Sequence, residues 1–332
     1  MRRGGGTVRP LELPAVKVLS IDGGGIRGLI PALVLAEVER RTRKRTAELF
    51  DLVAGTSTGG ILACALARPG PDGAPAFSAE ELSEIYFTEG PKIFDRSLLQ
   101  RITSLEGLID ERYSDDGLNA ALQRYLGDAR LSDALCDLFV TAYDVQGRFA
   151  FFFRSSRARD DPSYDFALTD VARATAAAPT YFEPFEVSDV AGAHTYPLID
   201  GGVYAINPAM CAYTDVAAAD ATLDVLASLG TGTYTRSYSF DEVDGWGQLQ
   251  WARPVLDFVF DGVADTIDFQ LSRLAGDRYI RLQADLRYAN DALDDASEAN
   301  LRRLRGEAER LIAERTAEIE TLCERLLVSA DV

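Results

Sequence analysis

The stretch SIDGGGIRGLIP, residues 20–31, places three consecutive glycines and an arginine between a predicted strand and a predicted helix. The apolar and β-branched residues 16–21 predict a buried strand, and Pro31 followed by ALVLAEVE is typical of a helix start. A strand-to-helix turn leaves backbone N–H groups unpaired at the positive end of the helix, and glycine lets an anion approach them closely. The stretch therefore predicts an anion-binding loop.

Strand-like runs recur along the rest of the chain, with helical stretches between them. They cover residues 49–55, 137–144, 148–154, 195–200, 222–230 and 278–284. This alternation predicts an α/β fold with a mostly parallel central sheet and helices on both faces. Ligands of such sheets bind at the carboxyl ends of the strands, so polar and glycine-rich residues there are candidates for a site.

Composition narrows the classes of partner. Acidic residues outnumber basic residues 52 to 34 and the net charge is −18, so we expect no nucleic-acid binding and little affinity for strongly anionic membranes. The four cysteines are far apart and His194 is the only histidine, so neither a metal site nor a disulfide scaffold is predicted. No apolar run reaches about 18 residues, and we expect a soluble, cytoplasmic protein.

Residues 67–77, ARPGPDGAPAF, are rich in proline and glycine and follow the second predicted helix, so they are predicted to form a loop and are a candidate for a lid. Residues 233–247, TYTRSYSFDEVDGWG, are a second candidate for mobility. Residues 296–328 alternate charges around an apolar stripe and predict a long surface helix.

The second strand is followed by GTSTGG, in which Gly55, Ser57 and Gly59 form the G-x-S-x-G pattern of a nucleophile elbow. Small residues on both sides of the serine let the chain turn sharply and hold the hydroxyl above the sheet. The pattern is common by chance, but here it follows an apolar strand and begins an apolar helix. Ser57 is therefore the predicted nucleophile.

A serine nucleophile needs a general base. His194 lies on the approach to a strand rather than at its carboxyl end, which favours a loop or strand-edge role. Asp200 ends the run TYPLID and is followed by two glycines, so it is the better candidate. A carboxylate is a weak base, and a Ser/Asp pair requires burial that raises its pKa.

With a serine nearby, the anion at the glycine loop is more plausibly a tetrahedral oxyanion than a phosphate. Backbone N–H groups of Gly23, Gly24 and Gly25 would face the developing charge, and Arg27 would add charge or hold the loop. Gly23, Gly25 and Gly28 also form the G-x-G-x-x-G dinucleotide fingerprint, but the second strand does not end in the acidic residue that binds ribose.

The blocks DGGGIRG, GTSTGG and DGG, in this order, resemble the patatin-like phospholipases, a family of lipid acyl hydrolases. Further segments similar to the family follow in the expected order over nearly the whole chain: YFTEGPKIF at 86–94, ATAAAPTYF at 174–182, SLGTG at 228–232 and LDDASEAN at 293–300. Lys17, Lys44 and Lys92 are the only lysines, a bias that suggests a bacterial source.

The resemblance implies a three-layer α/β/α sandwich in a single catalytic domain over residues 15–332, after an N-terminal extension at 1–14. It implies a dyad of Ser57 and Asp200 and an oxyanion hole at Gly23, Gly24, Gly25 and Arg27. It also implies hydrolysis of fatty-acyl esters of glycerolipids through an acyl-enzyme, without metal or cofactor, and transient contact with membrane surfaces.

Three alternatives stay open on the sequence. The chain could be a storage or binding protein without turnover, or a lipase that a cyclic nucleotide or a partner protein activates. The glycine fingerprint leaves a nucleotide-dependent oxidoreductase as a third. Head group, chain length and oligomeric state are not readable from these residues.

Overall fold

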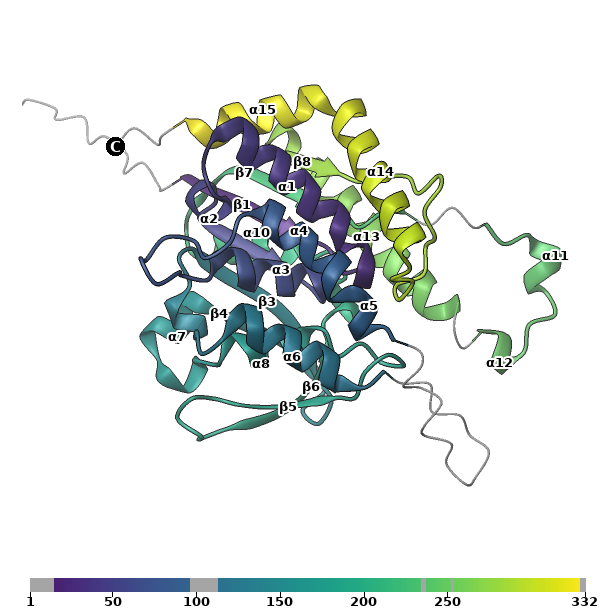
Figure 1. Cartoon of the computed structure of the whole chain (residues 1–332), viewed down its shortest axis with the longest axis horizontal. Helices are drawn as coiled ribbons and strands as arrows, with labels where there is room; N and C mark the ends of the chain where they lie inside the picture. The colour runs from purple at the N-terminus through teal and green to yellow at the C-terminus, as the bar shows by residue number, and fades with distance from the viewer. Residues whose placement is uncertain (1–14, 96–112, 234–236, 252–253, 329–332) are drawn as a thin grey trace, which may run out of the picture.

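The computed structural model describes residues 15–95, 113–233, 237–251 and 254–328, and the extension predicted at 1–14 lies outside them. In this part of the chain one eight-stranded sheet runs through the centre of the molecule (Figure 1). Its order is β5-β6-β3-β2-β1-β7-β8, with β4 paired to β3. The strands are β1 (Ala15–Ile21), β2 (Leu52–Gly55), β3 (Asp137–Asp144), β4 (Phe149–Arg154), β5 (Phe185–Ser188), β6 (Thr195–Asp200), β7 (Thr222–Leu229) and β8 (Tyr279–Leu282).

Helices pack on both faces of this sheet. One layer contains α1 (Leu29–Thr42), α3 (Thr58–Ala67), α4 (Ala79–Thr88), α6 (Asp115–Leu126), α8 (Leu168–Thr175), α14 (Glu298–Glu314) and α15 (Thr316–Leu327), and the other contains α10 (Ala209–Ala218) and α13 (Pro254–Leu274). Shorter helices are α2 (Thr46–Leu49), α5 (Gly90–Ile93), α7 (Ser155–Asp160), α9 (Gly202–Ala205), α11 (Phe240–Val243) and α12 (Gln248–Trp251).

The central strands divide their side chains between two hydrophobic cores. Leu19 and Val53 belong to the core under the larger helical layer, and Val18 and Leu52 belong to the core under α10 and α13. Successive side chains of a strand point to opposite faces, so a strand buried on both faces is apolar throughout. The predicted α/β fold with a central sheet between helices is confirmed.

The sheet is parallel at its centre and antiparallel at one side. β1 pairs in parallel with β2 and β7, β2 with β3, and β7 with β8. The pairs β3–β4, β3–β6 and β5–β6 are antiparallel. We did not predict β5, because its four residues, FEVS, are too few to show a periodic pattern.

The C-terminal helical segment is two helices instead of the single helix that we predicted. A straight helix over this segment would measure about 50 Å. Arg315, between α14 and α15, leaves the helical conformation with φ −110° and ψ 26°, and both helices then pack beside α1 (Figure 1). The charge pattern continues through the break, which is why the sequence did not reveal it.

Residues 68–77 form a loop after α3, one residue shorter than predicted, but the loop lies at the wrong end of the sheet for a lid. The amide of Leu135, just before β3, donates to the carbonyl of Ala67 at 2.9 Å. The loop is therefore near the amino end of β3, and the length of α3, about 15 Å, separates it from Ser57. The second candidate loop, 233–247, lies partly outside the described residues and contains α11.

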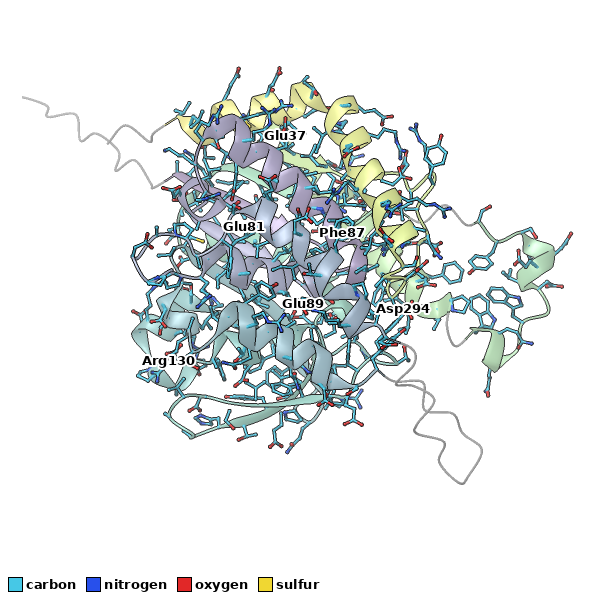
Figure 2. The ribbon with its side chains drawn as sticks, in the orientation of Figure 1. Glu37, Glu81, Phe87, Glu89, Arg130 and Asp294 are labelled. Atoms are coloured by element: carbon cyan, nitrogen blue, oxygen red, sulfur yellow. The ribbon has the colours of Figure 1, made fainter. Side chains whose placement is uncertain are left out.

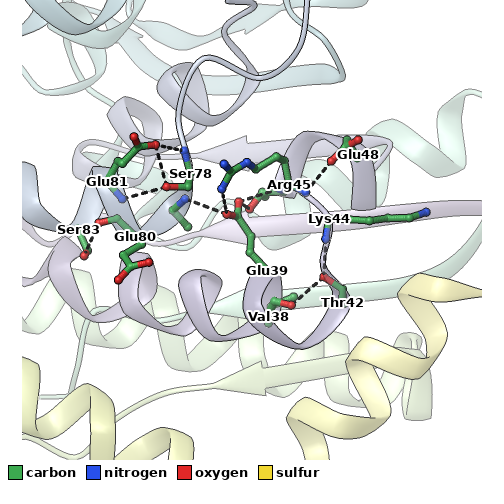
Figure 3. A network of polar contacts seen from close by, with 12 residues as sticks. Val38, Glu39, Thr42, Lys44, Arg45, Glu48, Ser78, Glu80, Glu81 and Ser83 are labelled. Atoms are coloured by element: carbon green, nitrogen blue, oxygen red, sulfur yellow. Dashed lines mark hydrogen bonds and ion pairs between the residues drawn. The ribbon is translucent and has the colours of Figure 1, made fainter.

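A buried carboxylate holds α4 in place on α1. Glu39, near the end of α1, accepts hydrogen bonds from the amides of Thr46 at 2.9 Å and Ala79 at 3.1 Å, and it pairs with Arg45 at 3.3 Å (Figure 3). Thr46 and Ala79 are the first residues of α2 and α4, where unpaired N–H groups favour an anion. The contact positions α4, which lines the cavity described below.

Candidate active site

Ser57 and Asp200 meet at one edge of the sheet although their strands run in opposite directions. β2 ends at Gly55, which pairs with Val140 of β3. β6 is antiparallel to β3 and pairs Asp200 with Ala142, two residues further along. Asp200 is thus at the level that Ser57 occupies after β2. We had expected Asp200 at the carboxyl end of a strand parallel to β2. It is at the carboxyl end of β6, but β6 runs antiparallel to β3 and therefore to β2.

Ser57 occupies a sharp turn between β2 and α3. Its backbone has φ 55° and ψ −125°, a conformation that non-glycine residues rarely adopt and that costs on the order of 1–3 kcal/mol. A Cβ on Gly55 would overlap the carbonyl oxygen of Gly59, and a Cβ on Gly59 would overlap that of Ile21. The amide of Ser57 donates to Oγ1 of Thr175 at 2.9 Å. Close packing and this bond hold the serine in the turn.

Asp200 is buried, with 4% of its surface exposed. Burial raises the pKa of its carboxyl group to about 7, although hydrogen bonds from the Ser57 side chain and the Gly202 amide lower it. The bond from the Gly202 amide measures 2.7 Å. A carboxylate with this pKa is a far better base at neutral pH than an exposed aspartate.

The three glycines of the loop have different environments. The amide of Gly23 donates to the carbonyl of Ile206 at 2.9 Å, and its own carbonyl accepts a bond from Oγ1 of Thr231 at 2.7 Å. In the described part of the chain, the amides of Gly24 and Gly25 donate to no other protein atom, and both residues line the cavity that contains Ser57. Gly25 has φ 55°, which favours glycine.

Arg27 lies on the other side of this loop from Ser57. Its side chain is buried, donates to the carbonyl of Gly232 at 3.3 Å, and lines a second, polar cavity of about 200 Å³. The same cavity is lined by Asp22 and Arg281, which form an ion pair at 2.6 Å. The position of Arg27 fits a role in holding the loop to the residues after β7.

An apolar cavity of about 140 Å³ begins at Ser57 and Asp200 and runs between α3, α4 and α6. Ile61, Leu62 and Ala65 line it from α3. Their spacing places them on one face of the helix over about 10 Å beyond the serine. The segments 86–94 and 174–182, on which the family resemblance rested, also contribute to its wall.

Glu89 is a buried charged residue in the wall of this cavity. Its carboxylate pairs with Lys92 at 3.0 Å and also with Arg124 of α6. Glu89 is labelled in Figure 2. The side chains of both partners are largely exposed. The negative charge of buried Glu89 is therefore compensated by two cations at the protein surface. The pairs connect α5 to α6 across one side of the cavity.

Several residues that shape the site were not predicted from the sequence. They are Thr175, which binds the Ser57 amide, Ile206 and Thr231, which fix Gly23, and Leu293, whose carbonyl accepts a bond from the Ile26 amide at 2.9 Å. Thr175, Thr231 and Leu293 fall in segments that resembled the family. No local pattern marks their contacts, because the partners are far apart in the sequence.

His194 is remote from Ser57 in the structure. It binds Asp189 through Nδ1 at 3.1 Å, its side chain is 57% exposed, and it precedes the first residue of β6. It does not line the cavity that contains Ser57. This position agrees with the predicted strand-edge role.

In the ranges that the structure describes, no group of three or more His, Cys, Asp or Glu side chains is arranged to hold a metal ion. Within the same ranges, no helix combines the length and apolar character needed to cross a bilayer. The four cysteines are free, and burial raises the pKa of the Cys64 thiol to about 12.

Comparison with known proteins connects this site to a family. The family described as Patatin-like phospholipase matches residues 19–213, a range that includes both Ser57 and Asp200. Patatin-like protein 2 from Arabidopsis thaliana is 35% identical over 83% of this chain and 78% of that protein. Patatin-like protein 1 from Oryza sativa subsp. indica is 32% identical over 93% of this chain and 84% of that protein.

A relative from Solanum tuberosum, named Probable inactive patatin-3-Kuras 1, is 32% identical over 86% of this chain and 83% of that protein. Among solved structures, VipD from Legionella pneumophila has a TM-score of 0.37 at 11% identity, covering 91% of this chain and 67% of that chain. We infer nothing from so low a TM-score. The match over residues 19–213 and the relatives above 30% identity show that the chain belongs to the patatin-like phospholipase family.

Proposed function

We propose that this protein is a serine acyl hydrolase that cleaves fatty-acyl esters of glycerolipids, with Ser57 as nucleophile and Asp200 as general base. Membership of the patatin-like phospholipase family supports the hydrolysis of lipid acyl esters in general. The observation that carries the finer proposal is the apolar cavity that begins at Ser57 and Asp200. Apolar walls suit an acyl chain, and the reacting ester would lie beside the serine.

The first half of the reaction acylates the enzyme. Oγ of Ser57 attacks the ester carbonyl while the Asp200 carboxylate takes the hydroxyl proton. The amides of Gly24 and Gly25 stabilise the oxyanion of the tetrahedral intermediate. Gly23, which binds Ile206, would support the loop instead. When the intermediate collapses, Asp200 returns the proton to the leaving alcohol.

The second half releases the fatty acid. Asp200 removes a proton from water, which attacks the acyl-enzyme carbonyl, and the same amides stabilise the second oxyanion. Ser57 then recovers its proton from Asp200. Both halves require the Asp200 carboxylate to be ionised before each attack, and its pKa of about 7 allows this at neutral pH.

Fatty-acid release from phosphatidylcholine vesicles and from p-nitrophenyl esters tests the proposal. We expect release by the wild type with EDTA present and none by Ser57→Ala. Ser272→Ala is the matched control, because Ser272 is exposed and does not line the cavity. Release by Ser57→Ala at the wild-type rate would refute the assignment of the nucleophile.

One relative is named as probably inactive, so an idle binding or storage protein is the second candidate. It predicts that wild type and Ser57→Ala both release nothing from any ester. Release that begins only after a cyclic nucleotide or a partner is added would indicate a gated lipase. The cytoplasmic location and the absence of a cofactor stay predictions.

A further inference from the structure

An aromatic cluster lies on the surface where α11, α12 and the start of α13 meet. The rings of Tyr238 and Trp246, and those of Trp246 and Trp251, have centroids 5.1 Å apart. Phe258 contacts the same group, at 5.4 Å from Tyr238 and 6.0 Å from Trp251. The chain contains two tryptophans, and both belong to this cluster.

The cluster lies at the surface and belongs to neither hydrophobic core, although Tyr238 and Trp246 are half-buried. Trp251 is 39% and Phe258 is 40% exposed, and Phe240 in α11 is 75% exposed. The buried residues of α13 are Ile267 and Leu271, in its second half, so its first half has no buried anchor. Figure 1 shows α11 and α12 projecting from the body of the molecule. Contiguous exposed apolar residues of this kind mark interaction surfaces.

The cluster and the apolar cavity share one stretch of α13. Phe260, two residues after Phe258 on α13, lines the cavity together with Ser57. Val259, between them, is partly exposed like Phe258. One short stretch of α13 therefore contributes to the substrate cavity and to the exposed cluster. A surface that binds at the cluster therefore lies within a few residues, along α13, of the wall of the cavity that contains Ser57.

The charges around the cluster restrict its partner. Residues 237–272 contain one basic residue, Arg253, and seven acidic residues: Asp241, Glu242, Asp244, Asp257, Asp261, Asp265 and Asp268. Acidic side chains repel anionic lipid but attract the ammonium groups of zwitterionic head groups. Aromatic faces also attract such cations. Tryptophan and tyrosine are, in addition, the side chains that favour the membrane–water interface.

We propose that the aromatic face formed by Tyr238, Trp246, Trp251 and Phe258 docks on a zwitterionic phospholipid bilayer. The orientation it imposes turns the entrance of the apolar cavity toward the lipid. The choice of a lipid partner rests on the proposed function, because an enzyme that cleaves lipid esters has to bind the membrane that contains them. The docking step itself needs no turnover.

Both tryptophans of the chain belong to the cluster, so tryptophan fluorescence reports directly on what the cluster contacts. In Ser57→Ala, where no lipid is consumed, we expect phosphatidylcholine vesicles to shift tryptophan emission to shorter wavelength. Lipids brominated on the acyl chains should quench that emission. Phe258→Asp in the same background keeps both tryptophans, and we expect at least tenfold weaker vesicle binding. Exposed Phe269, which is outside the cluster, provides the matched control Phe269→Asp, which should bind normally.

Four outcomes would overturn the proposal: no vesicle-dependent change in emission, equal binding by Phe258→Asp, tighter binding to phosphatidylglycerol vesicles, or burial of the cluster in a dimer that excludes vesicles. With Ser57 intact, Phe258→Asp should hydrolyse a soluble short-chain ester at the wild-type rate and vesicle lipid at least tenfold more slowly. Vesicle binding without any ester hydrolysis would refute the proposed function but still support the docking surface. Failure of the proposed function and failure of the docking proposal are therefore distinguishable.

Discussion

Two buried aspartates at the same edge of the sheet have different partners. Asp22 follows β1 and is 3% exposed, and Asp200 ends β6 and is 4% exposed. Burial raises the pKa of both carboxyl groups. Asp22 receives a bond of 2.6 Å from the guanidinium of Arg281, which opposes that rise. Asp200 receives hydrogen bonds from the Ser57 side chain and the Gly202 amide.

The difference follows from what surrounds each carboxylate. Arg281 also donates to Oγ of Ser228 at 2.8 Å, so it connects the ends of β1, β7 and β8 beneath the glycine loop. Asp200 lines the apolar cavity, and the described residues place no cation in an ion pair with it. Under the proposed function, the same side chain at the same depth is structural where a guanidinium compensates its charge, and it serves as the base where only a hydroxyl and an amide donate to it.

The largest effect should come from neutralising Asp200. Asp200→Asn keeps the size of the side chain and removes the base, so we expect kcat/KM for a soluble ester to fall about 10⁴-fold, as for comparable changes in catalytic groups. His194→Ala, the control, should stay within a factor of two. A comparable loss of kcat/KM in His194→Ala would contradict the assignment of Asp200 as the base. The proposed difference in role between Asp200 and Asp22 would then be wrong.

The same substitution at the two aspartates should change stability in opposite directions. Asp22→Asn leaves Arg281 buried without a carboxylate, and we expect the free energy of unfolding to fall by about 3 kcal/mol. Asp200→Asn removes a carboxylate whose folded pKa is raised. Ionisation of such a group destabilises the fold progressively as the pH rises from about 4, near the ordinary pKa of aspartate, to about 7, so Asp200→Asn should be about 4 kcal/mol more stable than wild type at pH 9 and nearly equal to it near pH 4.

Urea unfolding of both variants at pH 4 and pH 9 measures this difference. The double variant Asp22→Asn, Arg281→Gln should regain part of the stability lost in Asp22→Asn, because the unpaired guanidinium is gone. Destabilisation of Asp200→Asn at pH 9 to the same degree as Asp22→Asn would show that both aspartates are structural.

The pH dependence of catalysis sharpens the comparison further. As the proposed base, Asp200 would act only when it is ionised, so kcat/KM for a soluble ester should rise about tenfold per pH unit up to about pH 7 and then level off. Asp22→Asn, assayed in its stable range, should lower the plateau without moving the midpoint. A midpoint near pH 4 in the wild type would contradict the effect of burial on Asp200.

The smallest expected effect concerns the cavity that Asp200 lines. Ala65 contributes to its wall near the end of α3, away from Ser57. Ala65→Phe should lower hydrolysis of long-chain p-nitrophenyl esters about tenfold relative to short-chain esters, and overpacking should cost about 1–3 kcal/mol of stability. The short-chain ester is the internal control. An unchanged chain-length profile would show that acyl chains leave Ser57 along another path.

Local features were predictable from the sequence. The apolar run before GTSTGG and the glycines around Ser57 correspond to β2 and the turn, and TYPLID corresponds to β6. These predictions succeed because strands and tight turns depend on adjacent residues. The bounds of β2 were three residues too long, because residues 46–49 form α2, and a short helix carries no periodicity of its own.

The sequence by itself determined which side chains stand at the ends of β2 and β6, that the sheet lies between helical layers, and to which family the site residues belong. The tertiary structure alone decided that β6 enters antiparallel, that the Gly23 amide binds Ile206, and that Arg281 compensates Asp22 while Asp200 faces an apolar cavity. The physical reason is the distance along the sequence over which each property is set. The position of a side chain in a strand or turn depends on adjacent residues. Its pKa and its partners depend on burial and on charges that come from residues far away in the sequence.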